Sequence, residues 1–380
     1  MATMKALTIK EKGGAPVLIE RPIPFVRPTY MLVKVAAVGL NPADALCLDY
    51  GMNVPGHMMG CDWAGTVVEV GEDVTRDFKP GERVAGMCRS AEPFRDDVGC
   101  FSEYAVVKAD LALHIPDSMP FTDAAALGVA VVTTGRCLFD TFNIPYPVVS
   151  PEGKLSPPTS TAPQQILIYG GSTSMGTLTT QFAKLAGLHV LTTSSPTNHA
   201  MVKSLSNPDF IVDHYSPSAP AELLAESQRL TPTHGPLRMC MDTISSASSA
   251  VFCCKVLNPS AMPPGLDTPV EWVPAHVESD LTYSTIGPLT PPLPGIQTKR
   301  RIGFSFLGEE WAMLGPVQPA NVGDFERSRA FAVVAERCLA GGLVKPHVIE
   351  VQEGGLEAIP GGIERYRKGL VSGRKLVYVV

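Results

Sequence analysis

Hydrophobic and polar positions between residues 165 and 187 predict a strand, a turn and a helix in direct succession. The strand is predicted at 166–169, where Ile-Leu-Ile-Tyr is a short apolar run typical of a strand buried on both faces of a parallel sheet. Small residues fill most of 170–176, so the chain can turn there with few large side chains. Apolar residues then recur at helical spacing, at Leu178, Phe182 and Leu185.

The same two periodicities cover the rest of the chain. Residues 1 to about 127 show short β-type runs between Gly and Pro turns, such as 30–38 and 65–70, and predict a β-rich first part. After the central turn, strand-like and helix-like segments alternate, as a parallel sheet with helical crossovers requires. Further strands are predicted at 189–193, 210–212, 239–243, 270–273, 301–307 and 375–380, further helices at 219–229, 245–257 and 325–340, and Pro-rich surface loops at 145–163 and 288–294.

The small residues after the first of these parallel strands favour a phosphate-binding turn. Backbone N–H groups at a helix start hold an anion when no side chain blocks its approach. The small positions are Gly170, Ser172 and Gly176, so the strand, turn and helix context is present although the G-x-G-x-x-G spacing is not. Two other interpretations stay open. The glycines fit any tight turn, and 170–174 matches the G-x-S-x-G elbow of α/β-hydrolases except at its last position, with Ser172 as the nucleophile.

The end of the second parallel strand indicates which dinucleotide binds. A protein that binds NAD carries Asp or Glu there, which accepts hydrogen bonds from the ribose 2′-hydroxyl. Here residues 194–199 read Ser-Ser-Pro-Thr-Asn-His and contain no carboxylate that would repel a 2′-phosphate. The hydroxyl and amide groups, with Lys203 one helical turn later, predict NADPH. Lys203 also fits a solvated position on a helix surface.

Composition and charge narrow the class of protein. The chain has 380 residues, of which 45% are hydrophobic, and this suffices for two ordinary cores. Its net charge of −6 and its pI near 5.8 give no reason to expect nucleic acid as a partner. We expect no signal peptide and no segment that approaches a membrane span, and so a cytoplasmic protein without membrane contact. The nine cysteines form no C-x-x-C pair, and we expect most of them to be buried thiols.

Six motifs follow one another in the order found in the medium-chain dehydrogenase/reductase superfamily, which the sequence resembles over essentially the whole chain. They are Asn41-Pro42-Ala43-Asp44, Gly60-Cys61-Asp62-Trp63-Ala64-Gly65-Thr66-Val67, Pro80-Gly81-Glu82-Arg83-Val84, Gly99-Cys100-Phe101-Ser102-Glu103-Tyr104, Ala124-Ala125-Ala126-Leu127, and Gly369 with Ser372-Gly373-Arg374-Lys375. The resemblance implies an α/β fold with a Rossmann-type doubly wound parallel sheet and a β-rich, GroES-like catalytic domain. The expected boundaries are 1–140 with 310–380 for the discontinuous GroES-like domain, 141–164 for a Pro/Ser-rich insertion and 165–309 for the Rossmann domain.

Zinc-binding residues of the family's alcohol dehydrogenases are replaced in this chain. Asn41 stands where those enzymes carry a cysteine ahead of Asp44, and Gly60-Cys61-Asp62 replaces Gly-His-Glu. His57 is nearby, but no convincing third ligand accompanies Cys61 and Asp62, so we predict that no metal is bound. Without a metal to polarise a ketone, the sequence indicates reduction of a conjugated enoyl thioester or quinone.

A closer resemblance is to the trans-acting enoyl reductases that partner fungal polyketide synthases. The insertion 145–163, the strand-two ending 194–198 and the later Phe306-Leu307-Gly308-Glu309 carry it. It implies a zinc-independent oxidoreductase of secondary metabolism, in which NADPH delivers hydride to an α,β-unsaturated thioester on the acyl carrier domain of the synthase. Some members carry a lysine just after N-P-x-D, but this chain has Ala45-Leu46-Cys47, so no catalytic residue is assigned. Cys47 is either a proton donor or a buried structural thiol.

The resemblance also assigns binding residues by matching positions. The apolar residues among those expected to bind the substrate suit its alkyl chain. With Lys203, the predicted cofactor-binding residues are Asn41, Pro42, Ala43, Asp44, Gly170, Ser172, Thr173, Ser174, Met175, Ser195, Pro196, Thr197, Asn198, His214, Tyr215, Trp272, Val273, Ser372 and Gly373. The predicted substrate-binding residues are Thr133, Thr134, Gly135, Arg136, Cys137, Leu138, Phe139, Phe304, Ser305, Phe306, Leu307 and Gly308. Trp272 equally fits an ordinary core aromatic.

Three other functions remain as alternatives. The same fold suits a quinone oxidoreductase that acts on free small enones. A cofactor-binding protein without reductase activity would serve a synthase as a structural partner, which the missing lysine suggests. A hydrolase would use Ser172 with Asp242 and with His276 or His347.

Overall fold

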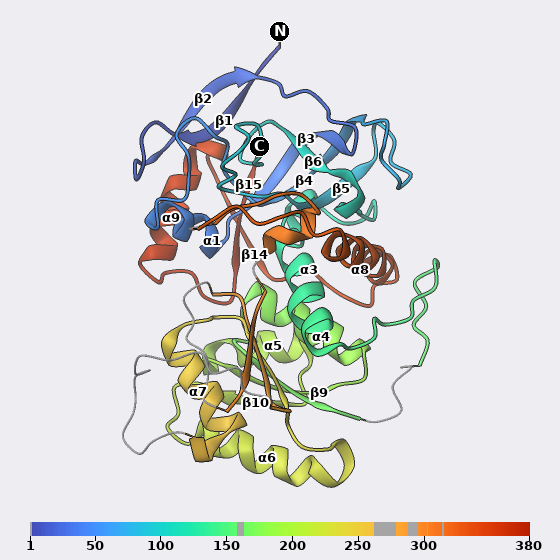
Figure 1. Cartoon of the computed structure of the whole chain (residues 1–380), viewed down its shortest axis with the longest axis vertical. Helices are drawn as coiled ribbons and strands as arrows, with labels where there is room; N and C mark the ends of the chain where they lie inside the picture. The colour runs from blue at the N-terminus through green and yellow to red at the C-terminus, as the bar shows by residue number, and fades with distance from the viewer. Residues whose placement is uncertain (1, 158–162, 262–278, 288–294, 302, 314) are drawn as a thin grey trace. The chain divides into compact units, whose positions relative to one another are not determined.

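The computed structural model describes residues 2–157, 163–261, 279–287, 295–301, 303–313 and 315–380 (Figure 1). The chain divides into two compact units. Unit 1 comprises Met1–Val132 and Phe304–Val380, and unit 2 comprises Thr133–Gly303. Unit 2 is therefore inserted, in sequence, between two parts of unit 1.

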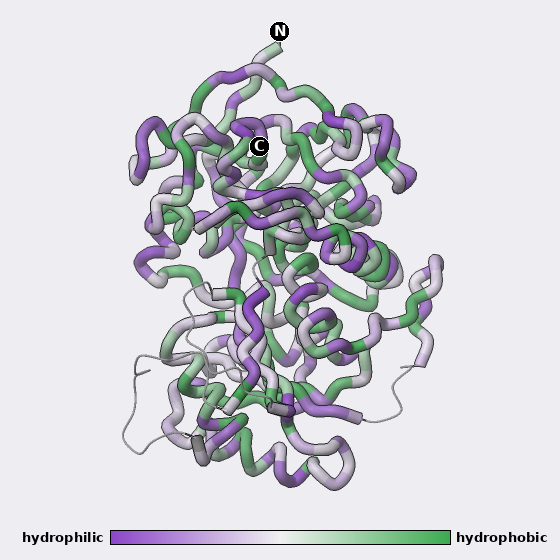
Figure 2. The backbone as a smooth tube through the Cα atoms, viewed as in Figure 1, coloured by the Kyte–Doolittle hydropathy of each residue, from purple (hydrophilic) through white to green (hydrophobic). Residues whose placement is uncertain are grey.

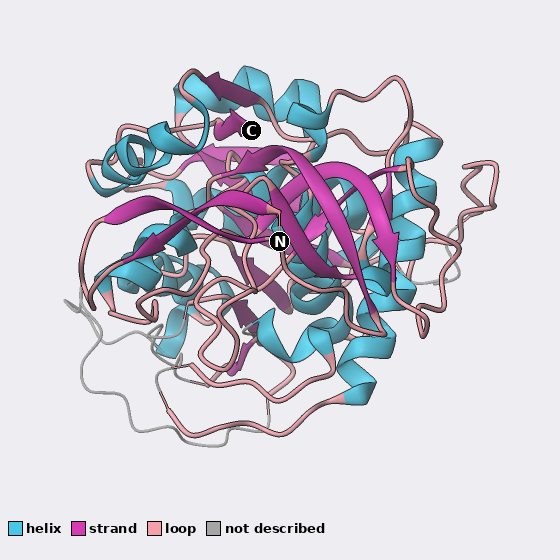
Figure 3. Ribbon diagram, turned by 90° about the horizontal axis from the view of Figure 1, so that it is seen from above, coloured by secondary structure: helices cyan, strands magenta, loops and turns pink. Residues whose placement is uncertain are grey.

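Unit 1 is built mainly on antiparallel strands. β1 (Thr3–Ile9) and β2 (Pro16–Pro22) form a two-stranded sheet. A seven-stranded sheet has the order β14-β15-β3-β4-β5-β7, with β6 paired to β3 beside this path. Its members are β3 (Tyr30–Gly39), β4 (Asp62–Val70), β5 (Arg83–Met87), β6 (Tyr104–Lys108), β7 (Leu113–His114), β14 (Ile349–Gln352) and β15 (Lys375–Val379). Figure 3 shows several strongly curved strands.

Apolar residues of β3 and β4 anchor the core of unit 1. Met31 and Val33 of β3 are fully buried, and Trp63 of β4 is 1% exposed in the same cluster. The helices of this unit are α1 (Pro42–Asp49), α2 (Phe121–Ala124), α8 (Val322–Ala340) and α9 (Ile359–Arg367), with short 3-10 turns η1 (Ala109–Leu111), η5 (Gly303–Leu307) and η6 (Gly355–Ala358). In Figure 2, α8 carries both hydrophobic and hydrophilic residues, as expected of a helix that is buried on one side. The predicted β-rich first part and the helix ending at Ala340 are confirmed.

Unit 2 contains a six-stranded sheet in which every pair is parallel. The order is β10-β9-β8-β11-β12-β13, with the first three strands in reverse sequence order and the next three in forward order. The strands are β8 (Gln165–Tyr169), β9 (His189–Ser194), β10 (Phe210–Asp213), β11 (Met239–Asp242), β12 (Thr282–Thr285) and β13 (Gln297–Arg300), and the helices are α4 (Ser174–Leu185), α5 (His199–Ser206), α6 (Ala219–His234) and α7 (Ala247–Leu257). This is the doubly wound order of dinucleotide-binding folds, and it confirms the expected fold class.

One predicted strand is wrong. Phe304 to Leu307, part of the expected strand 301–307, belongs to the 3-10 helix η5, and residue 302 is not described. The strands that follow β11 in the sheet are instead β12 and β13, and the edge strand β13 reads Gln-Thr-Lys-Arg. Periodicity could not separate a short apolar run from one buried helical turn, and it gave no signal for so polar an edge strand.

The loop predictions have different outcomes. Residues 145–157 form an irregular loop with one isolated bridge between Val149 and Leu155, as predicted for the described part of the insertion. The expected strand 270–273 and the Pro-rich segment 288–294 lie outside the described residues.

The helical run Phe121–Asp140 corrects the expectation that no segment approaches a membrane span. It continues from α2 through α3 (Gly128–Thr134) into a π-helix, η2 (Gly135–Asp140). This run is long and apolar enough to cross a membrane, but 72% of its 18-residue apolar window is buried in the protein, which is typical of a core helix. All nine cysteines are buried free thiols, as predicted.

Candidate functional site

The turn between β8 and α4 carries glycines at positions where a side chain would not fit. Gly170 has φ +86°, and a Cβ on it would lie 2.5 Å from Thr243 Oγ1. A Cβ on Gly171 would lie 2.3 Å from Thr192 Oγ1, and one on Gly176 would lie 2.2 Å from the carbonyl oxygen of Gly170. Close packing therefore requires glycine at two of the predicted small positions, Gly170 and Gly176, and Gly171 adds another.

The first turn of α4 offers hydrogen-bond donors to an anion. Thr173 caps the helix by accepting a hydrogen bond from Gly176 N at 2.8 Å, and no acidic residue occupies the first turn. The hydroxyl of Ser174 is buried and has no partner among the described residues. A helix N-terminus carries partial positive charge, and an unpartnered buried hydroxyl needs a partner. This cradle fits the pyrophosphate of a dinucleotide.

The end of β9 gathers the hydroxyl and amide groups that were predicted to bind a 2′-phosphate. Ser195 Oγ lies 3.1 Å from Thr197 Oγ1, and Asn198 Nδ2 donates to Ser195 Oγ at 3.0 Å. Pro196 opens the short turn between them, η3 (Pro196–Asn198). Lys203 is exposed on α5, and no ion pair with it is found in the part of the chain that the structure describes. No carboxylate stands among residues 194–199.

The next strand end lies beside this group. His214 N donates to Ser194 O at 3.4 Å, which places the residues that follow β10 next to the end of β9. The rings of His214 and Tyr215 are 3.9 Å apart, and Tyr215 is 75% exposed. Exposed aromatic rings at a strand end can lie against an adenine base, so both remain predicted cofactor residues.

The hydrolase interpretation of the turn gains no support from these contacts. The carboxylate of Asp242 accepts hydrogen bonds from Ile244 N, Ser245 N, Ser249 Oγ and Tyr283 Oη. Four donors leave it little capacity to orient a catalytic histidine. No hydrogen bond between Ser172 and a histidine occurs within the described ranges, and His276 lies outside them.

In unit 1, three of the family motifs and a residue just after a fourth meet at the carboxylate of Asp62. Lys375 Nζ pairs with Asp62 Oδ2 and lies 2.7 Å from Asn41 Oδ1. Asn41 Nδ2 donates to Asp62 Oδ2 at 3.0 Å, and Val129 N, just after the Ala124–Leu127 motif, donates to Oδ1 at 2.5 Å. The side chains of Asp62 and Lys375 are 0% and 3% exposed. Asp62 thus orders the N-P-x-D turn.

Asp44 is also removed from solvent. Its Oδ2 accepts a hydrogen bond from Asn41 N at 2.8 Å, while Oδ1 is buried without a partner among the described residues. Burial raises the pKa of Asp44 to about 7. Pro42 and Ala43 between these two residues are exposed, so they offer the accessible surface of the motif.

Cys47 and Cys61 are buried thiols. Burial raises the pKa of Cys47 to about 12 and holds the pKa of Cys61 well above its usual range. The described residues contain no group of three or more His, Cys, Asp and Glu placed to hold a metal ion.

The predicted substrate residues fall into two buried segments. In unit 2, Thr133 to Phe139 span the end of α3 and the π-helix η2, and Leu138 and Phe139 are 0% and 1% exposed. In unit 1, Phe306 and Leu307 are buried while Phe304 and Gly308 are partly exposed. Ser372 is exposed and Gly373 has φ +63°. Trp272 and Val273 lie outside the described residues.

Sequence reasoning missed two residues that hold these segments. Thr243 donates to Tyr169 O at 2.8 Å and lies 3.0 Å from Thr173 Oγ1, so it stabilises the turn between β8 and α4 from the neighbouring strand. Its position at the end of a predicted parallel strand was a usable signal. Arg89, 1% exposed and 3.0 Å from Glu92, gave no such signal because it stands in a loop.

Comparisons with known proteins place this geometry in a family. Residues 27–117 match the model of the alcohol dehydrogenase GroES-like domain. A trans-enoyl reductase of Aspergillus sclerotiorum is 34% identical over 380 residues, covering 99% of this chain and all of the relative. A trans-enoyl reductase of Alternaria alternata is 34% identical over 382 residues, covering 100% of both chains.

Solved structures agree on the fold. An alcohol dehydrogenase superfamily protein of Novosphingobium aromaticivorans has a TM-score of 0.72 at 19% identity, with 99% of each chain covered. The enoyl reductase CurK has a TM-score of 0.67 at 17% identity, again with 99% of each chain covered. A mycobacterial protein solved with NADPH has a TM-score of 0.65 at 18% identity, covering 99% of this chain and 100% of that one.

Proposed function

The chain belongs to the trans-enoyl reductases of the medium-chain dehydrogenase/reductase superfamily, and from this premise we propose that it uses NADPH to reduce an enoyl thioester borne by the acyl carrier domain of a polyketide synthase. The observation that carries the proposal is full-length similarity to trans-enoyl reductases together with a bare phosphate-binding turn. The protein is a nicotinamide-dependent oxidoreductase, and the choice of NADPH, the carrier domain and a cytoplasmic location are the proposed parts.

The preference for NADPH rests on the end of β9. Ser195, Thr197 and Asn198 present hydroxyl and amide groups there, and Lys203 adds an exposed ammonium group one helical turn later. A 2′-phosphate needs donors and positive charge, whereas a 2′-hydroxyl is best recognised by a carboxylate. None of these residues is acidic.

Residues of the chain bind and orient the reactants. NADPH, when bound, supplies the hydride that adds to Cβ of the substrate, and the alkene electron pair then forms a bond between Cα and a proton, which gives the saturated thioester and NADP⁺. The backbone of Gly170–Gly176 and the Ser174 hydroxyl hold the pyrophosphate. Asp62 and Lys375 fix the turn whose Pro42 and Ala43 we propose to contact the nicotinamide.

The proton for Cα is not best supplied by Cys47. A general acid works best when its pKa lies near the operating pH, and burial raises the pKa of Cys47 to about 12. Correct positioning of hydride and Cβ then accounts for most of the rate acceleration.

The proposal is tested by NADPH oxidation with a panel of enoyl thioesters, both free and attached to an acyl carrier domain, and with quinones. We expect turnover of enoyl thioesters and higher kcat/KM for the carrier-bound forms. Equal kcat/KM for free quinones and carrier-bound enoyl thioesters would favour a quinone oxidoreductase. Binding of NADPH without turnover of any thioester would indicate the catalytically silent partner.

A further inference from the structure

Glu309 follows η5 at a sharp reversal of the chain in unit 1. Gly308 has φ +68°, and a Cβ on it would lie 2.8 Å from Phe325 Cβ of α8. Only glycine suits both the backbone conformation and the space. The reversal directs the side chain of Glu309 toward strands that are far from it in sequence.

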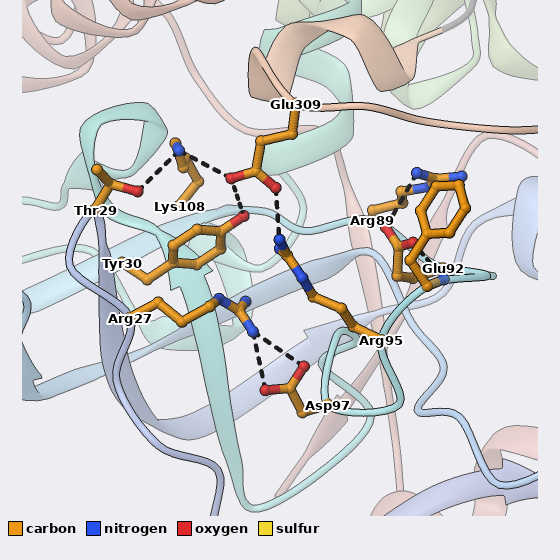
Figure 4. Close-up of polar contacts among 10 residues, drawn as sticks. Arg27, Thr29, Tyr30, Arg89, Glu92, Arg95, Asp97, Lys108 and Glu309 are labelled. Atoms are coloured by element: carbon orange, nitrogen blue, oxygen red, sulfur yellow. Dashed lines mark hydrogen bonds and ion pairs between the residues drawn. The ribbon is translucent and has the colours of Figure 1, made fainter. Parts of the chain in front are cut away.

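Three donors hold the Glu309 carboxylate. Tyr30 Oη donates to Oε1 at 2.7 Å, Lys108 Nζ donates to the same oxygen at 3.0 Å, and Arg95 donates to Oε2 at 3.1 Å (Figure 4). Tyr30 and Lys108 come from β3 and β6, and Arg95 comes from the loop after Cys88. Lys108 also donates to Thr29 Oγ1 at 3.0 Å.

The electrostatics of this group are those of a largely buried network. The side chains of Lys108 and Glu309 are 9% and 26% exposed, and Arg95 is 43% exposed. Burial alone would raise the pKa of Glu309, but its hydrogen bonds with Tyr30 and Lys108 and the nearby positive charges lower it overall. The carboxylate is therefore ionised at neutral pH and holds its three donors.

Arg89 contacts both ends of the segment 304–312. Its guanidinium donates to Ala312 O, lies 4.7 Å above the ring of Phe304 and pairs with Glu92 at 3.0 Å. Figure 4 shows Arg89 and Glu92 facing each other, separate from the contacts of Glu309. Charged groups of the β-rich unit thus hold residues 304–312 at both ends, through Arg89, and at Glu309 between them.

The apolar side chains of this segment fall into a buried pair and a partly exposed pair. Phe306 and Leu307 are 0% and 7% exposed, and they belong to one apolar cluster with Met87 and Val132. Phe304 and Trp311 remain partly exposed, with ring centroids 6.2 Å apart. A charged network of this kind adds little net stability after its desolvation, but it can specify one geometry. The geometry specified here is the orientation of two aromatic rings beside an apolar cluster.

We propose that Glu309 is a positioning residue for the enoyl substrate, because it fixes the segment whose Phe304 and Trp311 rings form a wall for the acyl chain. This inference rests on the proposed reductase function, and the substrate feature that the wall selects is the length of the acyl chain. We expect a long alkyl chain to reach the aromatic rings and a four-carbon chain to fall short of them. Glu309 therefore affects long substrates and leaves short ones unchanged.

The test compares crotonyl and 2-decenoyl pantetheine thioesters in the wild type, Glu309→Gln and Arg95→Gln. Glu309→Gln keeps the shape but leaves Lys108 and Arg95 without an anionic partner. We expect its KM for the decenoyl substrate to rise roughly 10-fold, with kcat, the crotonyl KM and the Kd of NADPH changed by less than about 2-fold. Arg95→Gln removes a single, half-exposed donor, so it keeps the fold and gives a smaller change in the same direction.

The control is Arg365→Gln. It breaks a pair with Glu350 whose side chains are 34% and 35% exposed, and it should leave both KM values unchanged. A purely structural role for Glu309 would lower Tm and reduce kcat/KM equally for both substrates, which would overturn the proposal.

Calorimetric binding of saturated decanoyl and butyryl pantetheine separates this inference from the proposed function. A wild type that binds decanoyl pantetheine more tightly than butyryl pantetheine, with a Kd raised roughly 10-fold by Glu309→Gln, supports the wall even if no enoyl thioester is turned over. An unchanged Kd for decanoyl pantetheine in that variant would overturn it even if the enzyme is an active reductase.

Discussion

Among the described residues of the candidate site, Lys375 and Asp62 form the most deeply buried ion pair. Asp62 also receives hydrogen bonds from Asn41 and Val129, so one carboxylate holds four segments of unit 1 together. Removing one partner of such a pair leaves an uncompensated buried charge, whereas replacing both with apolar groups costs far less.

Lys375→Met should therefore destabilise the protein by about 3–5 kcal/mol, measured as the free energy of unfolding in urea. The double variant Lys375→Met with Asp62→Leu should recover a large part of that loss. Lys79→Met, which removes a surface pair with Asp77 whose side chains are 66% and 82% exposed, is the control and should change little. A loss for Lys375→Met as small as that of the control would show that the buried pair does not hold these segments.

We propose that the residues after β9 determine the preferred dinucleotide. Ser195→Glu places a carboxylate where we propose that the 2′-phosphate binds, so it should raise the Kd of NADPH by roughly 10-fold to 100-fold and leave the Kd of NADH unchanged or lower. Lys203→Gln should raise the Kd of NADPH by less. Fluorescence titration measures each Kd. Equal changes in the Kd of NADPH and of NADH would show that these residues do not bind the 2′-phosphate.

At the scale of elements, the start of α4 depends on a close contact with the end of β8. A Cβ on residue 176 would lie 2.2 Å from the carbonyl oxygen of Gly170, and a backbone atom cannot move aside as a flexible side chain can. Gly176→Ala should therefore displace the turn and weaken NADPH binding at least roughly 10-fold. Gly361→Ala in α9 meets nothing within 4 Å and should keep NADPH affinity while stabilising the fold slightly. Isothermal titration calorimetry measures the Kd of NADPH for both variants. Normal NADPH binding by Gly176→Ala would show that the turn is not the pyrophosphate site.

The packing of α8 on β7 depends on pH through His114. Its ring lies 3.0 Å from Glu336 Oε2 and 3.3 Å from Glu82 Oε2, stacks on Phe78 and is repelled by Arg76. The hydrogen bond with Glu336 raises the pKa of His114. The pKa of Glu336 is lowered overall, since its hydrogen bond with His114 and the charge of Arg76 outweigh the effect of burial.

The sign of each shift defines a window of pH. The contribution of His114 is complete below its unfolded pKa of about 6.5 and is lost as pH rises through the raised folded value. The contribution of Glu336 is complete above about 4.3 and is lost as pH falls through the lowered folded value. The free energy of unfolding of the wild type relative to His114→Gln should therefore be largest between about pH 4.3 and 6.5. A difference that stays constant from pH 5 to 9, or that grows above pH 7, would contradict this assignment.

At the scale of the whole molecule, the two kinds of hydrophobic periodicity sufficed for the main elements. The strand 166–169, the small turn and the helix with Leu178 and Phe182 all stand where their pattern predicts, because buried strands and amphipathic helices leave direct traces in sequence. The polar edge strand β13 leaves no such trace, and the apolar Phe304–Leu307 forms a single helical turn instead of a strand.

Side-chain networks were less accessible from the sequence. The motifs around Asn41, Asp62 and Lys375 were visible, but the hydrogen bonds that join Lys375 to the other two connect residues more than 300 positions apart. The same holds for Glu309, whose three donors are between 201 and 279 positions away. Such contacts depend on the register of the folded sheet, which no local pattern encodes.

We propose that this chain transfers hydride from NADPH to the β-carbon of a carrier-bound enoyl thioester. The decisive measurement supplies NADPH deuterated at the transferred C4 position to the protein with an enoyl-loaded acyl carrier domain, and analyses the product by mass spectrometry and NMR. We expect one deuterium at Cβ of the saturated acyl chain and a hydrogen from solvent at Cα. An unreduced acyl chain, or a product without deuterium at Cβ, would contradict it.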